Sequence, residues 1–190
     1  MSQPIAKVKK MTTHAELTKD DIDFIHSQEL FFVATAPLSD HGHINCSPKG
    51  LRDTLYLPDP RHVAYLDLTG SGAETIAHLR ENGRITLMFC SFAGVPNILR
   101  IYGSGQPLLP GGSRYDSLIT KFPSRQGARA IILITISSIA NSCGYGVPMA
   151  AQMRQRERLE NWIAAKGEED LKTYRKRHNT RSIDGLPAIP

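Results

Sequence analysis

A short segment in the first third of the chain gathers polar side chains that could bind an anion. Residues 45–50 read Asn-Cys-Ser-Pro-Lys-Gly, so an expected strand ends in an amide, a hydroxyl and an ammonium group, followed by the flexible Gly50. Asn45 and Ser47 can hydrogen-bond a ligand, and Lys49 can neutralise its charge. Lysines at strand ends are commonly only solvated, so Lys49 alone does not establish a site.

A second segment could supply the rest of an anion site. Residues 68–75 read Leu-Thr-Gly-Ser-Gly-Ala-Glu-Thr, a glycine-rich turn that opens an expected helix. The first amides of a helix are unpaired and carry the positive end of its dipole, which attracts phosphate. Beside these amides lie Leu68, Gly72 and three hydroxyl donors, namely Thr69, Ser71 and Thr75. The turn alone reads equally well as an ordinary helix start, but the two segments together favour a phosphate-bearing ligand.

The elements that carry these segments can bring them together. β-rich runs on either side of turn residues predict a hairpin over residues 30–48, and another strand is expected at 63–68. Ser71 and Glu74 match a capping box, which predicts a helix over 71–82. If the second strand of the hairpin lies beside the strand at 63–68, its terminal lysine comes near the start of this helix.

The remaining pattern favours a β-rich fold with helices at its edge. Strands are expected at 54–57, 85–90, 98–105 and 130–139, and helices at 18–28, after Gly112, at 150–165 and at 168–178. About six strands are mostly sequential neighbours, and such an order favours antiparallel pairing. The sequence therefore predicts a mainly β (α+β) fold, a barrel or sandwich with peripheral helices, instead of a doubly wound parallel sheet.

Length and composition are those of one ordinary globular domain. The chain has 190 residues and a formal net charge of +5, of which residues 151–190 contribute +3. The basic excess thus lies largely in the tail, which argues against a surface built for nucleic acid. The three cysteines lack metal-binding or disulfide-framework spacing, and no apolar run approaches the ~20 residues of a membrane span. We therefore expect no metal site, no membrane partner and a cytoplasmic location, with a nuclear one left open.

The order of several motifs resembles one known family. The motifs are residues 45–50, the strand and turn at 65–72, the helix end at 78–84, the strand at 85–89 and the segment Leu-Arg-Ile-Tyr-Gly at 99–103. In this order they resemble the pyridoxamine 5′-phosphate oxidase-like family of flavin-binding split β-barrels. The resemblance covers roughly residues 25–140.

The resemblance implies a fold, a cofactor and an assembly. It implies a six-stranded antiparallel split barrel over residues 1–148, a helical extension over 149–190 that packs on the barrel or on a partner, and a homodimer with FMN between the subunits. Lys49 would neutralise the phosphate, and Asn45 and Ser47 would border the flavin ring. The cofactor-binding set would comprise Asn45, Ser47, Lys49, Gly50, Leu68, Thr69, Ser71, Gly72, Thr75, Arg100 and Cys143.

The chain also departs from the family pattern. The family's oxidases place an Arg-Lys pair at the start of the helix, where this chain has Glu74 and Thr75. We assign Glu74 to capping, so phosphate binding would rest on Lys49, backbone amides and hydroxyls. Arg100 would face the flavin, and the loop from Cys143 would contact flavin or substrate across the dimer, although both have ordinary structural alternatives. The oxidases' C-terminal vitamin-phosphate segment has no equivalent here.

These observations predict an FMN-dependent oxidoreductase that acts on an unknown small substrate, with a reduced nicotinamide as a possible electron donor. Vitamin B6 oxidation itself is not expected, and no catalytic acid or base stands out. One alternative is a flavin-binding or sensing module without turnover. Another is a nucleic-acid-binding barrel that uses the basic tail. A deazaflavin or haem in place of FMN is also open.

Overall fold

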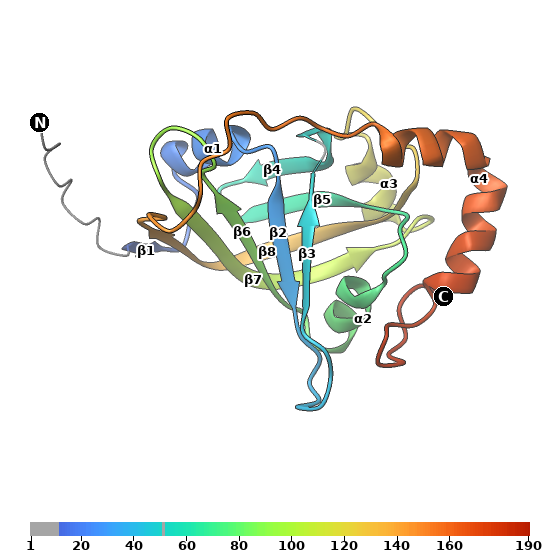
Figure 1. The fold of residues 1–190 in the computed structure, drawn as a ribbon. Helices are drawn as coiled ribbons and strands as arrows, with labels where there is room; N and C mark the ends of the chain where they lie inside the picture. The colour runs from blue at the N-terminus through green and yellow to red at the C-terminus, as the bar shows by residue number, and fades with distance from the viewer. Residues whose placement is uncertain (1–11, 51) are drawn as a thin grey trace, which may run out of the picture.

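The computed structural model describes residues 12–50 and 52–190, and an antiparallel sheet of eight strands organises this part of the chain (Figure 1). The sheet runs in the order β3-β2-β6-β7-β8-β5-β4, with β1 paired to β8. The strands are β1 (Thr12–His14), β2 (Phe31–Thr35), β3 (Asn45–Lys49), β4 (Leu55–Asp59), β5 (His62–Leu68), β6 (Arg84–Cys90), β7 (Ile98–Leu108) and β8 (Ala128–Ser142).

Helices lie around the sheet rather than across its centre (Figure 1). They are α1 (Lys19–His26), α2 (Glu74–Glu81), α3 (Ser113–Ile119) and α4 (Arg158–His178), with a short 3-10 helix at Arg52–Thr54. A capping box between Thr18 and Asp21 starts α1. None of the helices in the described ranges is long and apolar enough to cross a membrane.

Alternating residues of the curled sheet form the main core. On β2, β6 and β7 the inward side chains include Val33, Leu87 and Ile101, each fully buried, while their sequence neighbours face outward and are partly exposed. Ile76 of α2 packs into the same core, so α2 covers one end of the curled sheet. A smaller cluster, which includes Tyr115 of α3, covers the other face of β5 and β8.

The sheet does not close by strand pairing, and the resulting seam positions the polar residues. In the sheet order β3 lies at one end, and β5 lies next to last at the other. The two strands nevertheless meet, because Lys49 Nζ at the end of β3 donates a hydrogen bond to Asp67 Oδ1 of β5 at 3.0 Å. The fold is therefore an open barrel with an ion pair across its seam.

The C-terminal segment returns over this seam and over α2. After β8 an irregular stretch crosses the top of the barrel in Figure 1 and leads into α4, which bends at Gly167. The last residues then pack beside α2, where Arg80 donates to the Ala188 carbonyl and Asn179 Nδ2 donates to the Gly70 carbonyl at 2.9 Å. Ala188 is itself buried in the main core.

The predicted mainly β, antiparallel α+β fold is confirmed, with three corrections. The sheet has eight strands in the described residues instead of about six: the short β1 was missed, while the strand expected at 54–57 is present as β4. The helix expected at 71–82 begins only at Glu74. The helix expected at 150–165 begins only at Arg158; the preceding stretch is irregular, and its Ala150 N–H donates to the Phe92 carbonyl at 2.9 Å.

We expect Gly127→Ala to lower the free energy of unfolding by about 1–3 kcal/mol, since it adds strain and a clash. Gly127 has a φ of +74°, and a Cβ there would lie 2.6 Å from Ile163 of α4. Urea denaturation measures the effect. Gly146→Ala is the matched control, because its Cβ would meet nothing within 4 Å and its φ is not positive. Equal stability of the two variants would contradict this account of the Gly127–Ile163 packing.

Candidate functional site

A cavity of about 250 Å³ lies at the seam of the barrel. Strands β3 and β5, the turn before α2 and the first residues of α2 form its walls, and Leu159 of α4 covers part of it. The lining residues are Asn45, Ser47, Pro48, Lys49, Gly50, Thr54, Leu66, Leu68, Thr69, Gly70, Gly72, Glu74, Thr75, Arg129 and Leu159. Residues from both ends of the sheet and from the C-terminal segment thus meet in one hollow.

A buried carboxylate binds two cations in the wall of this cavity. Asp67 is fully buried, and its Oδ1 accepts from Lys49 Nζ at 3.0 Å. Its Oδ2 accepts from Arg129 Nε at 2.8 Å, and Arg129 has only 6% of its side chain exposed. Lys49 is more open, with 24% of its side chain exposed. The three groups carry a net positive charge beside the cavity.

The protonation of Asp67 follows from these partners. Burial by itself raises the pKa of a carboxyl group, but the charges and hydrogen bonds of Lys49 and Arg129 outweigh it and hold the pKa of Asp67 below its usual range. Asp67 is therefore ionised at neutral pH and acts as a fixed anion between the two cations.

A row of amide and hydroxyl groups continues along β3 from Lys49 toward the start of α2. Asn45 Nδ2 donates to Thr75 Oγ1 at 3.1 Å and to Thr35 Oγ1 at 3.2 Å, and Ser47 Oγ donates to Asn45 Oδ1 at 2.8 Å. Thr35 Oγ1 is also hydrogen-bonded to Nδ1 of the fully buried His78, at 3.0 Å. Burial lowers the pKa of His78, although nearby carboxylates oppose the shift. This network fixes the side chains that face the cavity.

The start of α2 differs from the expected capping box. Ala73 occupies the N-cap position, and no side-chain cap is present. Glu74 instead turns toward the C-terminal segment, where its Oε1 accepts from the Ile183 amide at 3.3 Å. The Thr69 hydroxyl also has a partner within the protein, because it donates a hydrogen bond to the Gly127 carbonyl at 2.9 Å. The assignment of Glu74 to capping was wrong, and Thr69 holds the turn in place.

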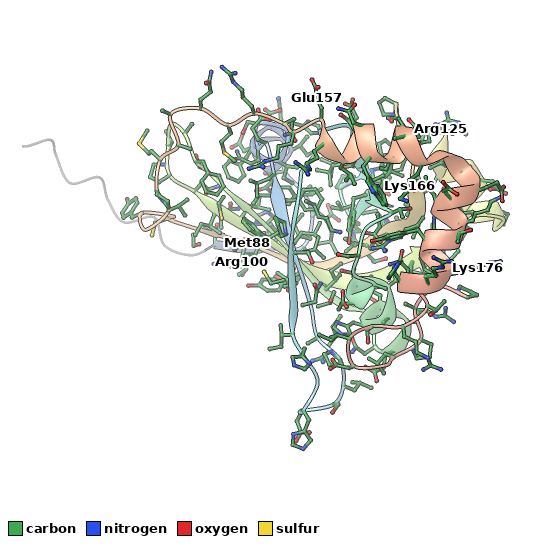
Figure 2. All side chains as sticks on the ribbon, turned by 45° about the vertical axis from the view of Figure 1, so that its right-hand side comes forward. Met88, Arg100, Arg125, Glu157, Lys166 and Lys176 are labelled. Atoms are coloured by element: carbon green, nitrogen blue, oxygen red, sulfur yellow. The ribbon has the colours of Figure 1, made fainter. Side chains whose placement is uncertain are left out.

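Most of the predicted site residues meet in the cavity, but three do not line it. Those that line it are Asn45, Ser47, Lys49, Gly50, Leu68, Thr69, Gly72 and Thr75. Ser71 lies outside as an exposed residue of the turn. Arg100 lies on the outer face of the sheet, opposite Met88 in the neighbouring strand, and its Nη1 donates to Ser142 Oγ at 3.1 Å (Figure 2). Cys143 is a half-buried free thiol just after β8.

Sequence reasoning missed the two central residues, Asp67 and Arg129. A single signal was present, because an aspartate interrupts the otherwise apolar strand Val-Ala-Tyr-Leu-Asp-Leu at 63–68. Charged residues in buried strands need a partner. The partner lies 62 residues further along the chain, so no local spacing could identify it.

Comparison with known proteins gives the family. A family model described as pyridoxamine 5′-phosphate oxidase matches residues 17–143. The chain belongs to this family. A curated relative from Aspergillus flavus, the pyridoxamine 5′-phosphate oxidase family protein ustO, is 40% identical over 185 residues, which cover 88% of this chain and 73% of the relative.

Solved structures support the same fold for this family member. The structure of HupZ from Group A Streptococcus is similar with a TM-score of 0.55 and 24% identity, over 70% of this chain and 99% of that chain. The structure of a histidine-to-alanine variant of HupZ is similar with a TM-score of 0.54 and 25% identity, over 65% and 98%. An FMN-binding protein from Syntrophomonas wolfei matches at a TM-score of 0.44 and 14% identity, over 68% and 82%, a likeness too loose to transfer a ligand.

We expect Asp67→Asn to lower the free energy of unfolding by about 3–5 kcal/mol at neutral pH, because it leaves buried cations without their anion. The pKa of Asp67 is lowered on folding. Its stabilisation is therefore complete above the unfolded value near 3.8 and is lost as the pH falls through the folded value. Urea denaturation at neutral and acidic pH measures both effects.

The exposed Asp170 provides the control for this prediction, as Asp170→Asn. If both variants unfold at the same urea concentration, or if Asp67→Asn keeps the full acid sensitivity of the native chain, the role given to Asp67 is wrong.

Proposed function

We propose that this family member binds FMN, with its phosphate in the seam cavity, and acts as a flavin-dependent oxidoreductase on a small substrate. One observation supports this most: two cations, a row of hydroxyl and amide groups and the uncapped start of α2 line the same hollow. Each is a recognised element of phosphate binding. The likeness of the chain to its relatives does not by itself specify the ligand or the reaction.

The lining fits the phosphate end of FMN better than the whole molecule. Its volume of about 250 Å³ is below the ~300–1,000 Å³ typical of sites that enclose a complete ligand. In our proposal Lys49 and the first amides of α2 bind the phosphate, and Asn45 and Ser47 border the flavin ring at the open side. When bound, the flavin supplies the capacity to accept and donate electrons, and the protein binds and orients it.

A second copy of the chain is the proposed cover for the open side. The outward residues of the central strands include the apolar or aromatic Phe32, Ala34, Met88 and Tyr102, beside the polar Thr86 and Arg100. Met88 lies opposite both Phe32 and Arg100, and no helix of the described chain lies over this face (Figures 1 and 2). Exposed apolar side chains rimmed by polar ones are typical of interaction sites. Because β3 borders both this face and the cavity, a partner here would also adjoin the flavin ring, and Arg100 would lie within the interface.

Protein purified without added cofactor tests the proposal. We expect flavin absorbance that corresponds to about one FMN per subunit. Extraction should release FMN, and it should not release riboflavin, a deazaflavin or haem in its place. Bleaching by NADH or NADPH without oxygen, and recovery with oxygen, would support an enzyme over a passive flavin binder. Protein that is colourless and also fails to bind added FMN would refute the proposal. If this colourless protein bound nucleic acid with an affinity that falls steeply with salt, the alternative of a nucleic-acid-binding barrel would be favoured.

We expect Lys49→Ala to weaken FMN binding by about 1–3 kcal/mol, because it removes a charge-assisted hydrogen bond to the phosphate. Quenching of flavin fluorescence during titration of the apoprotein measures the dissociation constant. Lys121→Ala is the control, since Lys121 is exposed after α3 and does not line the cavity. Equal FMN affinity of Lys49→Ala and the native protein would show that Lys49 does not bind the phosphate.

We expect Met88→Asp to convert the dimer to a monomer, because an isologous interface would bury a carboxylate from each copy. Light scattering after size-exclusion chromatography measures the mass, and circular dichroism checks folding. Asn161→Asp, on the exposed side of α4, adds the same charge elsewhere and should leave the dimer intact. A native protein that binds FMN as a monomer, or a Met88→Asp variant that stays dimeric, would argue against this interface.

A further inference from the structure

Arg129 occupies an irregularity in the sheet that directs it toward the cavity. Asp67 of β5 pairs with Ala130, whereas Leu68 pairs with Ala128, so Arg129 is the extra residue of a β-bulge on β8. Bulges bend a strand and change the direction of a side chain, and they are frequent beside binding sites. Arg129 lines the seam cavity. In a regular strand, successive side chains point to opposite faces of the sheet. The bulge interrupts this alternation at Arg129.

The hydrogen bonds of Arg129 leave donors for a ligand. Its Nε donates to Asp67 Oδ2 at 2.8 Å, and its Nη1 makes a long contact of 3.4 Å with the Gly70 carbonyl. Within residues 12–50 and 52–190 these are the hydrogen bonds that its guanidinium donates, and a guanidinium has several further N–H groups. Asp67 thus fixes one edge of the guanidinium in the wall, and the other donors are available at the cavity.

The charge balance of the cavity favours a second cation for phosphate binding. The ionised side chains in and behind the lining are Lys49 and Arg129 against Glu74 and Asp67, so their formal charges cancel. A phosphate monoester brings about −1.5 to −2 charges at neutral pH. Without Arg129 these charges would sum to −1, because Lys49 would stand against both Glu74 and the Asp67 behind it, which disfavours an anionic ligand. Arg129 therefore supplies the cation that balances Glu74, beside the contribution of Lys49 and the first amides of α2.

We propose that Arg129 binds the ligand phosphate directly and determines the preference of the site for a phosphorylated flavin over its dephosphorylated form. Asp67 is the positioning residue for both cations. The inference rests on the proposed flavin function and extends it, because it assigns the phosphate specificity to a strand residue outside the two segments that the sequence pointed to.

The ratio of the dissociation constants for riboflavin and FMN isolates the phosphate contribution. We expect the native apoprotein to prefer FMN, and Arg129→Gln to reduce this preference by about 10- to 100-fold, the scale of a charge-assisted hydrogen bond. Riboflavin affinity should change little. Arg129→Lys keeps the charge but loses the forked donor geometry, so we expect a severalfold smaller preference for FMN. A purely structural role would weaken both ligands together.

Arg175 provides a matched control. It is ion-paired to Glu168 with 13% of its side chain exposed, and it does not line the cavity. Arg175→Gln should keep the native preference. If folded Arg129→Gln keeps the native preference for FMN over riboflavin, the inference is overturned and the flavin function stands. If Arg129→Gln does not fold, Arg129→Lys is the deciding variant. A native protein that binds neither flavin, or both equally, overturns the inference together with the phosphate site of the proposed function.

Discussion

The ion pairs of Asp67 hold the seam of the barrel together. A buried carboxylate costs several kcal/mol of desolvation unless cations and hydrogen bonds offset it, and here the two cations come from opposite sides of the opening. Lys49 belongs to β3, at one end of the sheet order, and Arg129 belongs to β8, beside the other end. No backbone ladder joins β3 to β5 in the described chain. The shape of the cavity therefore depends on side-chain electrostatics at the point where a closed barrel would have had a hydrogen-bonded strand pair.

Hydrogen bonds from two other parts of the chain fix the turn before α2, and this turn forms part of the cavity wall. The Thr69 amide and hydroxyl both donate to the Gly127 carbonyl, and Gly127 in turn packs against Ile163 of α4. From the other side, Asn179 donates to the Gly70 carbonyl. A glycine-rich turn is entropically costly to order, so these contacts supply the rigidity that its own sequence does not. The C-terminal segment thus shapes the site, although it comes from the other end of the chain.

The sequence predicted best what depends on local pattern. β-rich runs bounded by turn residues located the strands, and the glycine-rich turn located the start of α2 to within three residues, because these signals are properties of neighbouring residues. The Ser71–Glu74 capping box was wrong because Ala73 is the N-cap and Glu74 the first helical residue, and the Glu74 carboxylate accepts from the Ile183 amide instead. The resemblance, more than periodicity, selected the lining residues. Asp67 with Arg129, and the packing of the tail on α2, are long-range contacts that no local pattern encodes.

The ionisable groups of the cavity are better suited to binding than to proton transfer. The lowered pKa of Asp67 makes it a weak base, and a guanidinium keeps its proton throughout the physiological range. Glu74 is engaged by the Ile183 amide at the rim, and Lys49 is paired with Asp67. Efficient acid–base catalysis requires a group whose pKa lies near the working pH. In the described chain the seam cavity offers a fixed electrostatic environment instead. If the proposed flavin binds there, its ring and the substrate must meet at the open side, where a partner subunit would supply the missing wall.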